Sequence, residues 1–556
     1  MKLKRVLPYI VLGVCIVLIG AVIFLHINAD NNQTNILPKS NGDVKILDYS
    51  KYNISDTKSA FKISVQKKLH QQVKKLEKKK YSFSNMLVLS NPYLTNTTGL
   101  YVHFSTTKDV KVSYSIKTSD SKIPTYSKNL YNSKGKYAKK HSYQIIGLVA
   151  GEKNYITITA KSKNGKKYTK TIVYKPGKLI SGKKNHISIG KKKSRQHLSS
   201  GLYTFIGDKN VKKRVTYLVD NDGYIRAELP IIGYNSLRLV NRKDYLYYAV
   251  NSSIIVKVNR LGRIVKEYNV GTQGYELHHD FSINSEGDIV ALATNIKAKE
   301  KTKYIEDRII KISNKTGKVT ELINFRHTFP DLYKKATKIA DVGSNKGYHD
   351  VMHMNSIQIV GSSLIVSSRE TSTILKINSY KKDPQISYMI SDSSIWQGVG
   401  DYSDKLLKKI NFFVSQAGQH SVNYISTNKK GEYYLELFNN NSGINTSRNT
   451  FSWSNYAGIG SVKSSKTSYS EYYKYLVNEK KGTYKLVNSF KVPYSSFVGS
   501  VQSKNGNVIV DSGLDGYVQE YDKNNKMILS FKTSKKYAYL YRVYKYDFYN
   551  LWFNKK

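Results

Sequence analysis

The chain of 556 residues contains a single cysteine and only 9 prolines. The cysteine, Cys15, lies inside an apolar run near the N-terminus, so residues 26–556 have none. Disulfides, thiolate metal sites and cysteine nucleophiles are therefore excluded from nearly the whole chain. Few prolines and 47 tyrosines favour extended, pleated structure over disorder.

Acidic residues are also scarce. The chain has 39 Asp and Glu against 90 Lys and Arg, a formal net charge of +51. A basic protein attracts polyanions, but here the basic residues are spread along the chain, without a helix-turn-helix, an RNA-binding aromatic motif or a zinc finger. We therefore expect no nucleic-acid partner, and consider anionic cell-wall polymers or an anionic substrate instead.

Only one long hydrophobic run is present, VLPYIVLGVCIVLIGAVIFL at residues 6–25. About 20 apolar residues span a bilayer as a helix. Lys2, Lys4 and Arg5 precede the run, which places the N-terminus in the cytoplasm and the following residues outside the cell. Residues 1–27 are thus predicted to be a cytoplasmic start and a transmembrane signal-anchor. A cleaved signal peptide, which would release a secreted protein, is the alternative, although HINADNNQ offers a poor cleavage site.

Two further regions precede the main part of the chain. Residues 28–80 are polar and then lysine-rich, and are interpreted as a spacer and a solvated stalk. In residues 81–180, alternating runs such as GLYVHFST and KVSYSIKT are separated by turns. The run NYITITAKSKNGKKYTKTIVYK has an Asn-Gly turn at its centre, typical of a hairpin. This region is predicted to be a small β-sandwich.

Hairpins recur from residue 195 to residue 556, among them IIVKVNRLGRIVKEYNV, SIQIVGSSLIVSS and GSVQSKNGNVIVDSG. Turns with Asp-Gly, Glu-Gly, Thr-Gly or Asn-Gly punctuate them. Short meandering strands over this length suit a β-propeller, and about 50–60 residues per blade give six blades. We predict an all-β chain: a six-bladed β-propeller at 195–556, preceded by the β-sandwich and the N-terminal transmembrane helix.

Three histidines open successive hairpins of the predicted propeller. They are His279 in HHDFSINSEGDIVALAT, His353 in DVMHMNSIQIVGSSLIVSS and His420 in GQHSVNYISTNKKGEYYLELF. The innermost strand of each blade lines a central channel, so residues just before these strands converge at its mouth. Gathered imidazoles act as nucleophiles, acid–base groups or metal ligands.

Two further observations help to decide whether the histidines act as nucleophile, acid–base groups or metal ligands. Arg369, in SSRETS, lies on the strand paired with the one that His353 begins. An arginine bound for the interior needs an anionic partner, and its guanidinium suits sulfate, phosphate or carboxylate. His349, Asp350 and His353 are candidate metal ligands, but their spacing gathers them only in a helix, and the sequence after His353 favours a strand. We predict no metal and no cofactor.

Several motifs around these residues resemble those of a known family. HHDF, the D-x-x-H-x-N-S-I element at 350–357, SSRETS at 367–372 and GQH at 418–420 resemble, in this order, motifs of the bacterial arylsulfate sulfotransferases. NGNVIVDSG at 505–513 and YRVYKYDFYN at 541–550 also fit. The resemblance implies a six-bladed propeller that moves a sulfuryl group from a phenolic sulfate ester to a phenol. It implies no nucleotide sulfate donor (PAPS), ping-pong kinetics and a transiently sulfated histidine.

The resemblance also implies roles for individual residues. His420 matches the nucleophile, and His353, His279, Arg369 and Asn355 match the groups that hold the sulfuryl oxygens and handle the phenol proton. His278 is expected to point away from the site if His279 points into it. Members of the family often pair up, which would make this chain a homodimer. The alternative function is a non-catalytic cell-surface propeller that binds anionic wall polymers or glycans.

Overall fold

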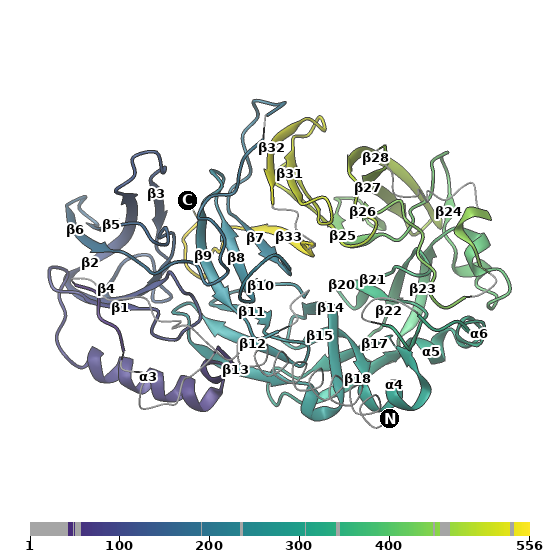
Figure 1. Cartoon of the computed structure of the whole chain (residues 1–556), viewed down its shortest axis with the longest axis horizontal. Helices are drawn as coiled ribbons and strands as arrows, with labels where there is room; N and C mark the ends of the chain where they lie inside the picture. Colours follow the sequence, from purple (N-terminus) through teal and green to yellow (C-terminus); the bar gives the residue numbers. More distant parts are fainter. Residues whose placement is uncertain are drawn as a thin grey trace, which may run out of the picture.

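The computed structural model describes residues 43–47, 49, 57–190, 192–233, 237–305, 307–340, 345–448, 451–455, 467–533 and 539–555. The predicted membrane anchor at residues 6–25 lies outside these residues. Within them, no helix is both long and apolar enough to cross a membrane. Strands make up most of the regular structure, which confirms the predicted all-β class (Figure 1).

The first folded region is one six-stranded sheet built around a long strand, β2. Its first half pairs with β1 and β4, and its second half pairs with β3 and β5, all antiparallel. The predicted Asn-Gly hairpin is present as β5 and β6, with Gly165 at a φ of 88° in the turn. The strands are β1 (Leu87–Ser90), β2 (Leu100–Thr118), β3 (Tyr126–Asn129), β4 (Ala138–Ile145), β5 (Asn154–Ser162) and β6 (Lys167–Tyr174).

The lysine-rich segment before this sheet differs from the solvated stalk that the sequence predicts. Short α2 (Thr57–Ala60) is followed by α3 (Ile63–Glu77). Val65, Leu69 and Val73, spaced four residues apart, are buried and belong to a cluster with side chains of β1 and β2. The lysines occupy the remaining face, so α3 is an amphipathic helix docked on the sheet.

The remaining described residues form six larger sheets, five with four strands and one with five. Their pairs are antiparallel except that β24 pairs with β28 in parallel. Strands follow one another in sequence within each sheet, except that β33 joins β7, β8 and β9 and that β24 lies beside β28. The sheets are β33-β7-β8-β9, β10-β11-β12-β13, β14-β15-β17-β18, β20-β21-β22-β23, β25-β26-β27-β28-β24 and β29-β30-β31-β32.

The strands of these sheets are β7 (Leu202–Ile206), β8 (Val215–Val219), β9 (Ile225–Pro230), β10 (Val240–Arg242), β11 (Tyr245–Ala249), β12 (Ile254–Asn259), β13 (Ile264–Asn269), β14 (Tyr275–Ile283), β15 (Ile289–Asn295), β17 (Asp307–Ile312), β18 (Val319–Asn324), β20 (Met354–Val360), β21 (Ser363–Ser368), β22 (Thr373–Asn378), β23 (Gln385–Ile390), β24 (Lys408–Lys409), β25 (His420–Ser426), β26 (Glu432–Asn439), β27 (Tyr469–Asn478), β28 (Thr483–Pro493), β29 (Ser500–Lys504), β30 (Asn507–Ser512), β31 (Tyr517–Tyr521), β32 (Met527–Lys532) and β33 (Arg542–Tyr546). A two-stranded parallel sheet, β16 (Tyr304–Ile305) with β19 (His349–Asp350), lies apart from them. The connections hold η2 (Gly271–Gln273), α4 (Ile296–Thr302), α5 (Phe325–Thr328), α6 (Pro330–Lys334), η3 (Ser393–Trp396), η4 (Ser403–Lys405) and η5 (Trp453–Asn455).

The edge strands β14, β20, β25, β29 and β33 lie side by side in that order. Of these, β14, β20, β25 and β33 are labelled near the centre of Figure 1. Strand β10 completes the set, since Arg238, just before it, pairs with Asp280 of β14, and Tyr546 of β33 donates to the Leu239 carbonyl. Apolar side chains fill the space between neighbouring sheets, as where Ala249 of β11 and Ala291 of β15 share one cluster. Residues at the ends of these central strands are thus brought together.

Candidate active site

The three predicted histidines stand at equivalent places on neighbouring sheets. His279 lies in β14, His353 directly precedes β20, and His420 begins β25. Each strand has a bulge at this point, where its pairing register shifts. His279 and His353 adopt left-handed backbone conformations with φ of 55° and 50°. A bulge re-aims a side chain out of the alternating pattern, and strained conformations of this kind gather at functional sites.

The structure brings these histidines into one cluster, as predicted. The Nε2 atoms of His279 and His353 are 3.1 Å apart, and the rings meet nearly edge to face. The positive charge of Arg369 is one cause of the lowered pKa of both His353 and His279, and His420 interacts electrostatically with both rings. Burial is the largest cause of both shifts, and it lowers the pKa of His279 well below its usual value.

The buried His420 ring is held in one tautomer. Its Nδ1 lies 2.8 Å from Oδ1 of Asn440 and 3.0 Å from the carbonyl of Gly418. Asn440 donates its own amide hydrogens to the carbonyls of Ser495 and Val498, so its oxygen must face His420. Both partners of Nδ1 are acceptors, and therefore Nδ1 carries the hydrogen and Nε2 keeps its lone pair.

The charge state of His420 follows from the same surroundings. Burial, with Arg369 contributing, lowers the pKa of His420 to about 3. The imidazole is therefore neutral at physiological pH. A neutral ring with a fixed N–H on one nitrogen presents a nucleophilic lone pair on the other.

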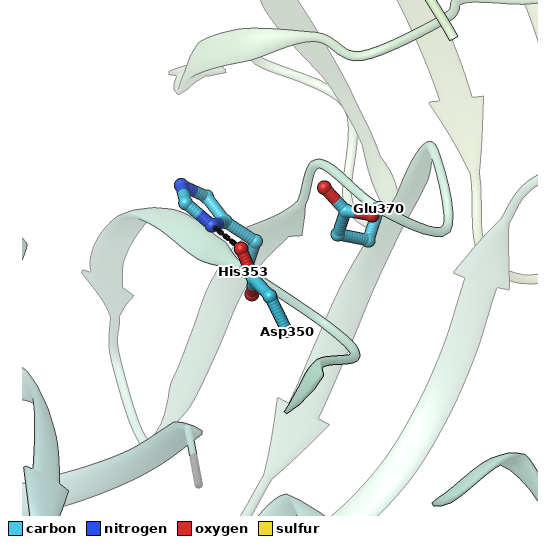
Figure 2. Close-up of side chains that lie close together, drawn as sticks. All are labelled: Asp350, His353 and Glu370. Atoms are coloured by element: carbon cyan, nitrogen blue, oxygen red, sulfur yellow. Dashed lines mark hydrogen bonds and ion pairs between the residues drawn. The ribbon is translucent and has the colours of Figure 1, made fainter. Parts of the chain in front are cut away.

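His353 is oriented by a carboxylate. Its Nδ1 lies 2.5 Å from Oδ2 of Asp350, the contact drawn as a dashed line in Figure 2. Asp350 also accepts hydrogen bonds from Arg369 Nη2 at 3.3 Å and from Asn345 at 2.8 Å. The same Nη2 donates to Glu370 at 2.6 Å. Arg369 thus bridges two buried carboxylates, one of which fixes the ring of His353.

Asp350, His353 and Glu370 place their ligand atoms within 4.8 Å of one another, so they are a candidate metal site (Figure 2). Arg369 already occupies both carboxylates, and Nδ1 of His353 already bonds to Asp350. His349, the other ligand considered from sequence, instead bonds to the Lys338 carbonyl. The residues present therefore suit a guanidinium better than a metal ion. Burial raises the pKa of Glu370 to about 7.

Two predicted site residues keep unused polar atoms. Among the described residues, Nε of Arg369 and Oδ1 of Asn355 have no hydrogen-bond partner although both are buried. Asn355 donates one amide hydrogen to the carbonyl of Gln419 at 2.7 Å, which leaves its second hydrogen for another acceptor. Buried polar atoms without a partner indicate a place for a ligand.

One detail of the sequence prediction is corrected. The sequence predicts that His278 points away from the site, but its Nδ1 lies 2.9 Å from Nδ1 of His279. The bulge between Leu277 and Phe281 breaks the alternation that would have separated them.

Sequence reasoning missed several residues that support the site. Asn440, in the FNNNSG run, gave no spacing signal that links it to His420. Asp280, directly after His279, holds Arg238 by two hydrogen bonds of 3.0 Å and also pairs with Arg542 at 2.8 Å. Arg542 in turn donates to the main-chain carbonyl of Asn355. Asp280, which follows His279 in HHDF, was the one signal in the sequence that could have pointed to these arginine contacts.

The comparisons with known families agree with this geometry. A family model described as arylsulfotransferase (ASST) matches residues 188–546, which include all five predicted site residues. The chain belongs to the arylsulfotransferase family. A second model, described as an arylsulfotransferase Ig-like domain, matches residues 87–177 and so covers β1 to β6. The family is that of a sulfotransferase acting on aryl substrates, and no curated protein matches the sequence significantly.

Solved structures resemble this arylsulfotransferase only distantly. A functionally unknown protein from Desulfotomaculum acetoxidans is 9% identical with a TM-score of 0.33, and covers 62% of this chain and 99% of its own. AztD from Citrobacter koseri is 11% identical with a TM-score of 0.29, covering 62% and 97%. The WD40 domain of coronin from Toxoplasma gondii is 8% identical with a TM-score of 0.29, covering 63% and 78%. Likenesses at this level do not bear on function.

Protonation of His420 is expected to destabilise the arylsulfotransferase in acid. Its pKa is about 3 when folded, against an ordinary value of 6.5, so between these values the folded state binds fewer protons. Its contribution to stability is complete above the ordinary pKa and falls by about 1.4 kcal/mol per pH unit below it. Urea unfolding should therefore show wild type losing stability relative to His420→Gln as the pH falls. Parallel pH curves for the two proteins would contradict the buried, neutral ring.

Proposed function

We propose that this arylsulfotransferase transfers a sulfuryl group from a phenolic sulfate ester to a phenolic acceptor through a sulfated His420, without a nucleotide sulfate donor. The six larger sheets are the blades of a β-propeller, with the site at one mouth of its channel. The apolar run at residues 6–25 anchors the enzyme and places the site outside the cell. Observations on His420, Arg369 and the histidine pair support this proposal.

The first half-reaction sulfates the enzyme. Nε2 of His420 attacks the sulfur of the donor, a bond forms between nitrogen and sulfur, and the bond from sulfur to the phenolic oxygen breaks. The electron pair of the broken bond stays on the phenolate. His279 or His353, whose Nε2 atoms face each other, supplies the proton that makes it a neutral phenol.

Charge on the sulfuryl oxygens is balanced by groups already in place. Arg369 is the nearby cation, and its unpartnered Nε–H is available to a sulfuryl oxygen. The second amide hydrogen of Asn355 is a further donor. Fixed donors in a dry site stabilise developing charge more strongly than water does. The ring of Tyr541, 5.9 Å from that of His279, provides an aromatic wall for the substrate.

The second half-reaction returns the enzyme to its starting state. An acceptor phenol replaces the first, the histidine pair removes its proton, and its oxygen attacks the sulfur. The bond between sulfur and Nε2 of His420 breaks, and the electron pair returns to the imidazole. Because donor and acceptor use one site in turn, ping-pong kinetics are expected.

The single observation that carries this proposal is the state of His420. Asn440 and Gly418 fix the hydrogen on Nδ1, and burial beside Arg369 keeps the ring neutral. A histidine with only a structural role has no need for a bare nitrogen next to a cation.

The proposal is tested with p-nitrophenyl sulfate as donor and phenol as acceptor. We expect release of nitrophenol that depends on phenol, with equal formation of phenyl sulfate. Parallel-line kinetics in double-reciprocal plots would support the sulfated intermediate. A folded protein that transfers nothing to any phenol would contradict the proposal and favour a propeller that only binds anionic polymers or glycans.

A further inference from the structure

The cluster continues beyond the residues that touch substrate in the proposed reaction. From His353, the contacts run to His279 at 3.1 Å and on to His278 at 2.9 Å. Nε2 of His278 lies 3.5 Å from Oδ1 of Asp307, which is fully buried in β17. At the other end, His353 bonds to Asp350. Three imidazoles therefore form a line between two buried carboxyl groups.

Three of these contacts are hydrogen bonds, those from Asp350 to His353, to His279 and to His278, and each needs one hydrogen, so the three bonds point together in one of two directions. If Asp350 is ionised, His353 donates to it from Nδ1 and has a bare Nε2. His279 must then donate from Nε2, and His278 must donate from Nδ1 to the bare Nδ1 of His279. Nε2 of His278 is then left bare, without a hydrogen-bond partner among the described residues, and its nearest carboxyl oxygen is Oδ1 of Asp307 at 3.5 Å. A neutral Asp307 can supply a hydrogen to this nitrogen.

The charged surroundings select this direction over its reverse. Asp350 accepts hydrogen bonds from the cationic Arg369 and from Asn345, which favour its ionised form. Asp307 accepts a hydrogen bond from the main chain of Met354 and has no cation in contact among the described residues. Burial raises the pKa of both carboxyl groups. Arg369 and Asn345 oppose this rise at Asp350, whereas the pKa of Asp307 lies well above its usual value, which agrees with a neutral carboxyl group there.

We propose that His278 and Asp307 are positioning residues that hold the hydrogen of His279 on Nε2 and replace it when His279 gives it to the leaving phenolate. This rests on the proposed function. The proton of Asp307 moves to Nε2 of His278, that of His278 Nδ1 moves to Nδ1 of His279, and that of His279 Nε2 moves to the phenolate. Every ring stays neutral and Asp307 becomes ionised. The acceptor phenol returns the proton along the same line in the second half-reaction, so none is exchanged with water.

The test uses paired substitutions. In His278→Asn the side-chain amide keeps a donor near the position of Nδ1, whereas His278→Leu has a similar size and no donor. In Asp307→Asn the amide still donates to His278 but has no proton to give up. The ring nitrogens of His279 are followed by NMR in the full chain labelled with 15N-histidine, and sulfuryl transfer is measured alongside.

The expected results separate positioning from proton supply. Wild type and Asp307→Asn show His279 protonated on Nε2, while His278→Leu shows a mixture of tautomers. His278→Leu loses at least about tenfold in kcat/KM, and His278→Asn recovers most of it. Asp307→Asn loses at least about tenfold in kcat although its His279 tautomer is unchanged.

Two results would overturn the inference. One is a wild-type His279 protonated on Nδ1, and the other is equal activity of His278→Leu and His278→Asn. The NMR measurement does not need turnover, so a wild type without transfer but with the expected tautomer would count against the proposed function alone.

A second inference comes from a cavity of about 850 Å³, far from the histidines in sequence. It is lined by residues of β2 and β4, of the end of α3 and the segment after it, of the β3–β4 connection and of the β12–β13 turn. Its basic lining residues are Lys74, Lys78, Lys79, Lys80, Lys134, Lys140 and Arg260. Glu77 is the one carboxylate that lines it, and Lys74 and Tyr101 both bond to Glu77.

The other six cations form no ion pair with a described residue. Arg260 is the most enclosed of them, and it donates to the main-chain carbonyl of Ser142 at 2.5 Å. Burial lowers the pKa of Arg260, because removing its charge from water is unfavourable. An anionic ligand beside the guanidinium would offset this loss of hydration. Two aromatic rings line the cavity, and they pack edge to face on each other, Tyr81 on His103.

We infer that this cavity binds a phosphate-rich linear polyanion. Several separate cations suit a ligand with repeated charges. Nucleic acid would need free aromatic faces for stacking, and the two rings here are engaged with each other. The docked helix α3 therefore supplies cations to a site that it shares with the first sheet and with the β12–β13 turn.

Binding of a short linear polyphosphate to the full chain tests this inference. Lys78→Gln/Lys80→Gln/Lys134→Gln is expected to weaken it at least about tenfold and to lower the salt slope of log Kd by about 2. Lys163→Gln/Lys166→Gln/Lys167→Gln removes the same charge from the β5–β6 turn and should have little effect. Sulfuryl transfer should be unchanged in both. Equal loss in the two variants, no binding at physiological salt, or tighter binding of a single-stranded oligonucleotide would overturn the inference.

Discussion

Replacing His420 with alanine is expected to abolish acceptor-dependent sulfuryl transfer, with a loss of at least about 1000-fold in kcat. The substitution removes the nitrogen proposed to attack sulfur, the Nε2 of His420, whose lone pair is fixed because Asn440 and Gly418 hold the hydrogen on Nδ1. Neither His279 nor His353 can take its place, because their Nε2 atoms face each other. The measurement is phenol-dependent release of nitrophenol from p-nitrophenyl sulfate.

His327→Ala is the matched control, because His327 is exposed on α5 and should be dispensable. With donor alone, mass spectrometry of wild type should find one added SO₃ on the peptide that contains His420, and none in the variant. Transfer that survives His420→Ala would leave the enzyme in place and show that another residue is the nucleophile.

Replacing Asp350 with asparagine is expected to lower kcat by about 100- to 10,000-fold. The carboxylate accepts the Nδ1 hydrogen of His353 at 2.5 Å, whereas an amide can donate to that nitrogen and so favours the other tautomer. It also removes one of the two negative charges that hold Arg369, which is then free to turn toward Glu370 alone. Both changes affect transition-state groups, so KM should change less than kcat.

Asp331→Asn provides the control for this substitution, since Asp331 lies on the surface helix α6 and pairs with Lys334. Thermal unfolding of both variants checks that the fold is kept. If Asp350→Asn retained near wild-type kcat, the carboxylate would have only a structural role, and the assignment of the His353 tautomer would be wrong.

The sequence predicted the β architecture well because hairpins are local. Alternating runs with glycine turns, such as the one around Gly165, became antiparallel pairs. The docking of α3 was not predicted, because Val65, Leu69 and Val73 are few among many lysines and their partners lie in β1 and β2. The pairing of β33 with β7 was equally out of reach, since nothing local in either strand specifies the other.

The position of the site could be predicted because a histidine recurs at the same place in three hairpins. His279, His353 and His420 hold equivalent positions in their hairpins, and the structure brings them together with Arg369. Side chains alternate between the two faces of a regular strand, but this alternation breaks at the bulge in β14. For this reason the direction of His278 was predicted wrongly. Asn440 could not be found either, because its role depends on a side-chain contact with His420 made from the loop directly after β26, the strand that pairs with β25.

Strand β33 sets the order of events when the protein is made. It pairs with β7 and carries Arg542, which contacts Asp280 and the main chain beside the site. A ribosome releases residues 542–546 long after β7, so while residues 421–541 are being added the growing chain holds all three histidines without the strand that pairs with β7. Catalytic competence should therefore appear abruptly, with the final segment, rather than rise as successive sheets emerge.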